Sequence, residues 1–287
     1  ALSIFWTQAI IAAPLNVTVV LSEEGGAYQE FGDALRNRLS QTNVLLGFTS
    51  INQHVHDSDL IIAVGMKAAT ALAKNKSAAI FNVFIPQEGY SRLQQEFARR
   101  ADTFSAIYLD QPIERQLNLI GAALPNIRHI GILYTTPPND LHAMREFAAK
   151  RKMTVHEQMV TPENSLSRAL QELLRNSEVI LALPDAAIYN AATIRNILLA
   201  SYRANVPIIG FSVNFVRAGG LCAVFSTPAQ IASQAGSVIV QYADTRSLPA
   251  AQYAQEFEVL VNIQVTRSLN LNLPSSTELH KQIGGRP

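Results

Sequence analysis

The sequence predicts an α/β protein made of two doubly wound, flavodoxin-like parallel-sheet lobes in series. Strand-length runs that are apolar throughout indicate strands buried on both faces, as in a parallel sheet. Segments with helical spacing separate these runs, and the alternation restarts after Pro125. A chain of 287 residues also suits two lobes better than one hydrophobic core.

The first half alternates between apolar or β-branched runs and amphipathic segments. Phe31, Leu35 and Leu39 recur at four-residue intervals, which is helical spacing. A final amphipathic segment, 111–124, is expected to join the two halves. The predicted strands are 16–21, 44–48, 60–64 and 79–84, and the predicted helices are 28–39, 66–73 and 90–99.

The second half repeats the pattern. Its strand at 154–159 is more polar than the others, so we expect it near a sheet edge. The predicted strands are 130–134, 154–159, 179–183, 207–211, 221–225 and 257–261, with helices at 140–150, 166–174, 193–204 and 229–242. The expected domains are a first lobe at 14–124, a second at 125–255, and a polar segment at 256–287 that crosses back to the first lobe.

The stretch 1–13 is apolar, uncharged and ends in small residues, which predicts the tail of a secretory signal peptide. A short helix docked on the first lobe is the alternative. No later run approaches the roughly 18 apolar residues of a membrane-spanning helix, so the mature chain is not expected to span a membrane. The net charge of +1 without a clustered basic face argues against nucleic-acid binding.

Ligands of open parallel sheets bind beyond the carboxyl ends of the strands, and two sheets facing each other across a hinge form a cleft that can close. This rule nominates the residues at which the predicted strands end. They are Ser22, Gly65, Met66 and Phe84 in the first half, and Tyr134, Asp185, Phe211 and Ser212 in the second.

Several of these residues have a structural interpretation beside the binding one. Asp185 and Ser22 each precede a helix and suit an N-cap. Gly65 suits either a tight turn or the close approach of an anionic ligand group. Phe84, Tyr134 and Phe211 fit an aromatic clamp or plain core packing.

No enzymatic or metal constellation stands out in the sequence. His54 and His56 have a spacing that zinc can use, but nothing completes the site and a solvated loop is favoured. There is no Gly-x-Ser-x-Gly elbow, phosphate-binding Walker loop or Gly-x-Gly-x-x-Gly motif. We therefore predict a protein that is not an enzyme and that carries no cofactor or metal.

Three motifs, in order, carry a resemblance to a known family. The first is Asp59-Leu-Ile-Ile-Ala-Val-Gly65 followed by Ala68-Ala69. The second is Val206-Pro-Ile-Ile-Gly-Phe-Ser212 with the later Ala218-Gly-Gly220. The third is Phe257-Glu-Val-Leu-Val-Asn262 with Leu269-Asn-Leu-Asn-Leu-Pro274, near the C-terminus. Together they resemble the ABC transporter substrate-binding proteins, in particular the tryptophan/tyrosine type, and the likeness covers nearly the whole chain after Pro14.

The resemblance implies a type I periplasmic binding protein fold. It also implies a periplasmic protein that captures a small solute, amino acid-like or otherwise organic, and delivers it to an inner-membrane ABC permease. By position, Asp185 would face a ligand ammonium, and Asn139 fits the loop that holds a ligand carboxylate. Asp140 stands where the family has serine, and its charge would repel a carboxylate. The alternative function is a ligand-sensing module of the same fold that signals to a membrane kinase or cyclase.

Overall fold

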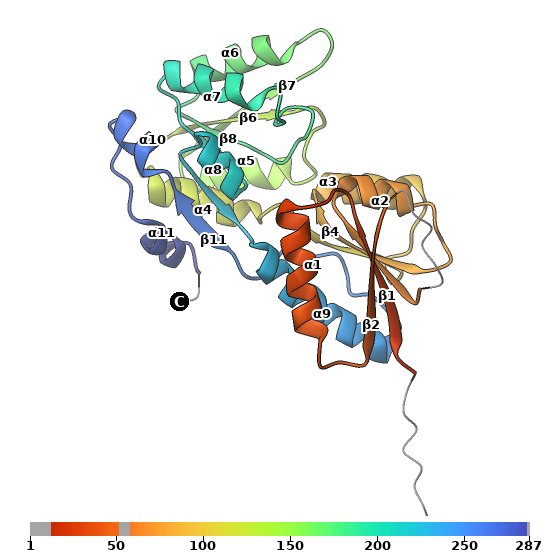
Figure 1. Ribbon diagram of the computed structural model, residues 1–287. Helices are drawn as coiled ribbons and strands as arrows, with labels where there is room; N and C mark the ends of the chain where they lie inside the picture. Colours follow the sequence, from red (N-terminus) through yellow and green to blue (C-terminus); the bar gives the residue numbers. More distant parts are fainter. Residues whose placement is uncertain (1–12, 52–57, 286–287) are drawn as a thin grey trace, which may run out of the picture.

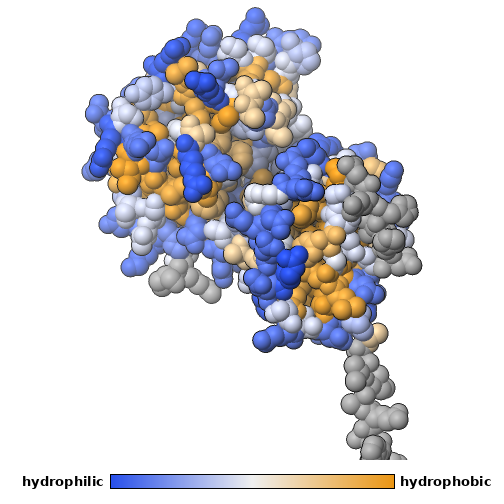
Figure 2. Space-filling model, viewed as in Figure 1, coloured by the Kyte–Doolittle hydropathy of each residue, from blue (hydrophilic) through white to orange (hydrophobic). Residues whose placement is uncertain are grey.

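The computed structural model describes residues 13–51 and 58–285. The chain forms two α/β lobes, which meet at a narrower waist in the space-filling view (Figures 1 and 2). The prediction of two parallel-sheet lobes is therefore confirmed. The predicted signal-peptide tail, apart from Ala13, and the pair His54 and His56 lie outside the described residues.

The first lobe contains a five-stranded sheet in the order β2-β1-β3-β4-β5, and each neighbouring pair is parallel. Every residue of β3, β4 and β5 is buried, as the apolar runs predict for strands covered on both faces. Strand β5 was not predicted. The bounds are Leu15–Leu21 for β1, Val44–Ser50 for β2, Leu60–Val64 for β3, Ala79–Ile85 for β4 and Phe104–Tyr108 for β5.

Four helices cover this sheet: α1 (Gly26–Leu39), α2 (Met66–Leu72), α3 (Gln87–Glu96) and α9 (Pro228–Thr245). The first three alternate with the strands, as the sequence predicts. The fourth comes from the far end of the chain and lies beside α1, which Figure 1 shows as a light-blue helix next to a red one.

The second lobe contains a six-stranded sheet in the order β11-β10-β9-β8-β6-β7, parallel except between β10 and β11. Strand β7 lies at the edge, as its polar sequence predicts. The strands are β6 (His129–Tyr134), β7 (Thr154–Met159), β8 (Val179–Leu181), β9 (Ile208–Gly210), β10 (Cys222–Phe225) and β11 (Glu258–Val261). The helices are α4 (Ile113–Ala123), α5 (Leu141–Lys150), α6 (Leu166–Asn176), α7 (Ile194–Arg203), α8 (Val213–Ala218), α10 (Ile263–Ser268) and α11 (Ser276–Gln282).

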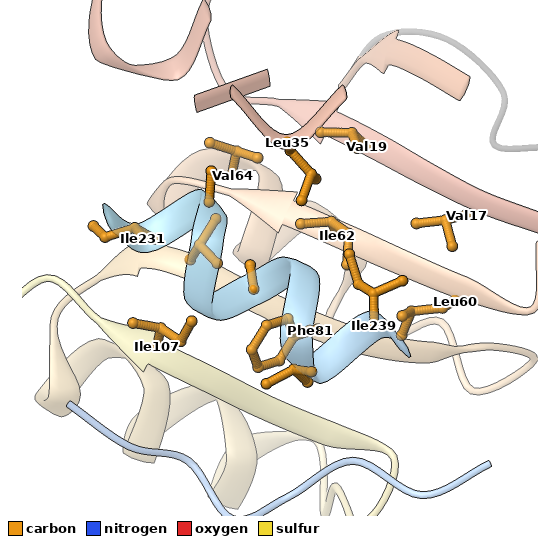
Figure 3. Close-up of a cluster of buried hydrophobic side chains, with 14 of the residues drawn as sticks. Val17, Val19, Leu35, Leu60, Ile62, Val64, Phe81, Ile107, Ile231 and Ile239 are labelled. Carbon is orange, nitrogen blue, oxygen red and sulfur yellow. The ribbon is translucent and has the colours of Figure 1, made fainter. Parts of the chain in front are cut away.

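Helix α9 completes the core of the first lobe. Ile231 and Ile239 of this helix belong to the same buried cluster as Leu60, Ile62 and Phe81 of the first sheet, and Figure 3 shows them packed together. Ile239 and Phe81 are both fully buried. The first lobe therefore depends on a helix that follows β10 in the chain, after five of the six strands of the second sheet.

The structure corrects the expected domain boundaries. Helix α4 was assigned to the first lobe, but its buried residues Leu117 and Ile120 belong to the core of the second. The segment 256–287 was expected to cross back to the first lobe. Instead β11 pairs with β10, and Leu279 of α11 is buried in the second core. Helix α9 makes the return crossing, because its apolar face covers the first sheet.

The chain therefore passes between the lobes near residues 110, 226 and 255, and side chains tie these crossings together. Gln111 donates from Nε2 to Ser226 Oγ at 3.0 Å, and Ser226 Oγ donates to the Glu256 carbonyl at 2.6 Å. Arg115 donates to the Ala254 carbonyl at 3.2 Å. Three bonded crossings constrain the relative motion of the lobes to a hinge. Within the described residues, no helix is long and apolar enough to cross a membrane.

Candidate functional site

A cavity of about 300 Å³ lies between the lobes, beside the crossings. Its walls come from the carboxyl ends of strands in both sheets, where ligands of parallel sheets bind. The first lobe contributes the start of α2, the start of α3 and the residues after β5. The second contributes α4, the loop from β6 to α5 and the loop after β8. The lining includes Met66, Gln87, Glu88, Arg92, Asp110, Gln116, Tyr134, Thr135, Asn139, Asp140, Met144, Leu183 and Asp185.

Four of the predicted site residues lie on this cavity: Met66, Tyr134, Asn139 and Asp185. Asn139 donates from Nδ2 to Ser91 Oγ of α3 at 3.2 Å, so it joins the second lobe to the first. The hydroxyl of Tyr134 donates to Glu157 on the edge strand at 2.9 Å. Burial, followed by this hydrogen bond, raises the pKa of Tyr134. Its ring is therefore a fixed wall of the cavity.

Asp185 holds two strand ends together. Its Oδ2 accepts from the Thr135 backbone N–H at 2.8 Å and from the Thr135 hydroxyl at 2.7 Å. Its Oδ1 accepts from the Ala187 N–H at 3.0 Å. The structure thus favours the structural interpretation of Asp185, because three donors already occupy its carboxylate.

Ser22 and Gly65 lie together at the start of α2, outside the lining of the interlobe cavity. Ser22 Oγ accepts from the Ala68 N–H at 2.9 Å, so it caps this helix. Gly65 has φ of 87°, and a Cβ there would lie 2.6 Å from the Tyr28 hydroxyl oxygen. Its lack of a side chain is a packing requirement. Ser22 lines a separate hollow of about 520 Å³ on the first lobe.

The remaining predicted residues, Phe84, Phe211 and Ser212, also lie outside the lining of the interlobe cavity. Phe84 is buried, and its ring centroid lies 5.6 Å from that of Phe31 in the first core. Phe211 packs against Phe215, with ring centroids 5.4 Å apart. Ser212 Oγ accepts from the Phe215 N–H at 3.2 Å and caps α8. The aromatic residues do not converge as a clamp.

The sequence reasoning missed Glu88, Asp110 and Gln116. Asp110 lies two residues after β5. The sequence pattern did not predict this strand, so the strand-end rule did not nominate Asp110. The run Phe104–Tyr108, bounded by charged residues on one side and Asp110-Gln-Pro112 on the other, is the signal that nominates it. Glu88 lies in the first turn of α3, one turn before Arg92, with which it pairs at 3.4 Å.

Asp110 and Asp140 are half-buried carboxyl groups on opposite sides of the cavity. Asp110 Oδ2 accepts from the Gln87 N–H at 2.6 Å. Burial, together with the nearby Asp140 and Glu88, raises the pKa of Asp110 to about 6 against the effect of this hydrogen bond. Burial also raises the pKa of Asp140, whose side chain caps no backbone amide of α5. The surroundings of both carboxyl groups disfavour the ionised form, because burial removes the water that would solvate its charge.

The carboxyl groups of the cavity do not form a metal site. Over residues 13–51 and 58–285, no three His, Cys, Asp or Glu side chains are close enough together to hold one ion. What the cavity offers chemically is a partly apolar volume with negative charge and hydrogen-bonding groups at its walls. Such a volume suits a small organic molecule.

Comparison with solved structures shows the fold. The chain resembles a conserved domain protein from Vibrio cholerae O1 biovar El Tor, with 18% identity, a TM-score of 0.69, and 94% of this chain and 99% of that chain covered. It also resembles an ABC domain in complex with L-Trp from Streptococcus pneumoniae, with 17% identity, a TM-score of 0.71, and 95% and 99% covered. A ligand-free, open substrate binding protein with adhesive properties from Clostridium difficile gives 15% identity, a TM-score of 0.68, and 91% and 96% covered.

These likenesses establish the two-lobed fold of type I periplasmic binding proteins. No curated protein sequence matches this chain. Residues 32–279 match the family described as ABC transporter substrate binding protein. The match begins within α1, ends within α11 and so spans both lobes. The chain therefore belongs to the ABC transporter substrate binding protein family.

Proposed function

We propose that this protein captures a small solute in the interlobe cavity, outside the cytoplasmic membrane, and delivers it to an ABC permease in that membrane. The observation that carries the proposal is the cavity itself, because both lobes contribute walls to it. A solute held there contacts both lobes at once and stabilises the closed arrangement. The chain binds its solute and does not transform it.

The geometry supports a closing motion around that solute. The hydrogen bond from Asn139 to Ser91 joins the lobes beside the cavity and is exposed, so water can replace it when the lobes separate. The bonded crossings at Gln111, Ser226 and Glu256 hold the lobes together where the chain passes between them, and Gln111 also lines the cavity. Separation is therefore expected at the Asn139–Ser91 contact, away from the crossings, which gives the solute a path in and out.

A thermal-shift screen of amino acids, amines, nucleosides, short peptides and organic acids tests solute capture. A solute at 100 times its Kd that binds only the folded protein adds about 2.7 kcal/mol of stability. For a protein of this size we expect the melting temperature to rise by several degrees. If no solute class raises the melting temperature and the chain instead turns one over, the proposal is wrong.

Uptake by cells tests the delivery step. Cells that lack the protein should take up the identified solute more slowly than cells that produce it. A variant that does not bind the solute serves as the control for expression. Equal uptake with and without the protein would contradict delivery while leaving binding intact.

A further inference from the structure

The interlobe cavity carries an excess of negative charge. Glu88 and Asp110 line it from the first lobe, and Asp140 and Asp185 line it from the second. Arg92 is the one cationic residue in the described lining, and it pairs with Glu88. The two lobes thus bring acidic groups toward each other without a matching positive charge between them.

The four carboxyl groups differ in how many hydrogen bonds and ion pairs they already form within the protein. Asp185 accepts three hydrogen bonds, and Glu88 pairs with Arg92. Asp110 accepts the Gln87 N–H through one oxygen, and Asp140 caps no backbone amide of its helix. Asp110 and Asp140 are therefore the acidic groups that a ligand can engage.

A buried amide adds an independent acceptor to the same cavity. Gln116 is only 8% exposed and lines the cavity wall. Its Nε2 donates to the Gln111 carbonyl at 2.6 Å, which fixes the amide orientation. Its Oε1 accepts from no donor among the described residues, and it is not one of the fully buried side-chain atoms that lack a partner. It is therefore open to the cavity and can accept from a ligand that donates.

The other walls are apolar. Met66 comes from the first lobe, and Ile113, Met144 and Leu183 come from the second. A volume of about 300 Å³ is at the small end of organic-ligand sites. These walls suit a compact aliphatic or aromatic body. A bare metal ion is disfavoured, because no three acidic or histidine side chains of the described lining converge on one point.

We propose that the cavity takes a small organic amine, with an apolar body and no carboxylate, whose ammonium group lies against Asp110 and Asp140. This inference rests on the proposed solute-binding function and names the chemical class of the solute. A carboxylate on the ligand would meet the excess negative charge, whereas an ammonium group neutralises it. Gln116 Oε1 supplies an uncharged acceptor for a further N–H.

The direction of the pH effect follows from the groups around Asp110. Glu88, Asp140, Tyr108 and Tyr253 face it, and none of them is cationic. Its raised pKa of about 6 means that it takes up a proton readily as the pH falls. Protonation removes the charge that attracts the ammonium group. Amine affinity should therefore fall as the pH falls through about 6.

Isothermal titration with matched pairs tests the inference. Each pair is an amino acid and the amine left after its decarboxylation: tryptophan and tryptamine, phenylalanine and 2-phenylethylamine, lysine and 1,5-diaminopentane. The members differ in the carboxylate alone. We expect at least one amine to bind at pH 7.5 at least tenfold more tightly than its amino acid, and more weakly at pH 5. Amino acids that bind as tightly as their amines would overturn the inference.

Two isosteric variants test the residues. Asp140→Asn and Asp110→Asn should each weaken amine binding about tenfold or more. Asp244→Asn, an exposed residue on α9, changes the net charge equally and should leave binding unchanged. Should Asp110→Asn fail to fold, Asp140→Asn decides, since its side chain caps no amide of α5. Unchanged binding in Asp140→Asn overturns the inference. If no amine binds but a neutral or anionic solute does, this inference fails and solute capture stands.

Discussion

Replacing Ile239 with alanine should lower the free energy of unfolding by about 2–5 kcal/mol, the usual range for truncating a fully buried aliphatic side chain. Ile239 is fully buried between α9 and the first sheet, where it shares a cluster with Ile62 and Phe81. The first lobe lacks this helix until the chain has traversed most of the second lobe. The variant should therefore weaken the first lobe, although the mutated residue lies far along the chain. Urea unfolding measures the change.

Val240 supplies the matched control because it is the next residue in the same helix and is 37% exposed. Val240→Ala should change the stability by no more than about 0.5 kcal/mol. Hydrogen exchange identifies the lobe that is affected. In Ile239→Ala, the amides of β1 and β3 should exchange faster while those of β6 and β8 keep their protection. Equal losses in both variants, or faster exchange confined to the second sheet, would contradict the placement of α9.

Asp185→Asn should lower the free energy of unfolding by about 1.5–3 kcal/mol, the range for hydrogen bonds to a charged group. The asparagine amide turns one of the two carboxylate oxygens into a donor. That donor would face either the Thr135 N–H and hydroxyl or the Ala187 N–H, which donate to Asp185 in the native protein. The link between the ends of β6 and β8 is weakened in both orientations. Chemical denaturation at pH 7 measures the change.

The sequence left open whether Asp185 faces a ligand or serves the fold, and the measurement separates the two. Thr135→Val removes the hydroxyl donor and leaves the charge of Asp185 in place. It should reproduce part of the loss of stability. A variant Asp185→Asn that melts like the native protein but binds solute at least tenfold more weakly would show that the carboxylate serves the ligand instead.

The alternation of strands and helices could be predicted because burial on both faces leaves a strong sequence signal. Strand β5 was not predicted from the sequence because Ser105 interrupts its short apolar run. In the structure Ser105 is fully buried, and its carbonyl accepts the side-chain amide of Asn82 on the neighbouring strand at 2.9 Å. Single-sequence patterns do not distinguish such a buried polar pair from a turn.

The assignment of helices to lobes could not be read from periodicity. The apolar face of α9 would cover either sheet, and only the tertiary packing decides that it covers the first. Helix α11 was missed for a different reason, since its segment is largely polar. A capping signal was present: Ser275 and Glu278 form a reciprocal capping box, and the helix buries Leu279 against the second sheet.

Some of the residues that the sequence nominates line the interlobe cavity, and others do not. The strand-end rule nominated Met66, Tyr134 and Asp185, which line the cavity, because each lies at or just after the carboxyl end of a strand that ends toward the opposite lobe. The same rule nominated Ser22 and Phe211, which lie at strand ends away from it. The rule identifies an edge of each sheet, but the positions of the chain crossings decide which part of that edge faces the other lobe.

Filling the interlobe cavity tests the account most directly. Ala186 lines the cavity and is exposed, so Ala186→Trp places an indole in it without disturbing a core. Ala192→Trp, at another exposed alanine of the same loop region that lies outside the lining, is the control. With a solute found in the thermal-shift screen, calorimetry should show that Ala186→Trp loses at least 90% of the binding affinity, a factor of about ten or 1.4 kcal/mol, and that Ala192→Trp keeps it. Native affinity in Ala186→Trp would place the solute elsewhere and contradict binding between the lobes.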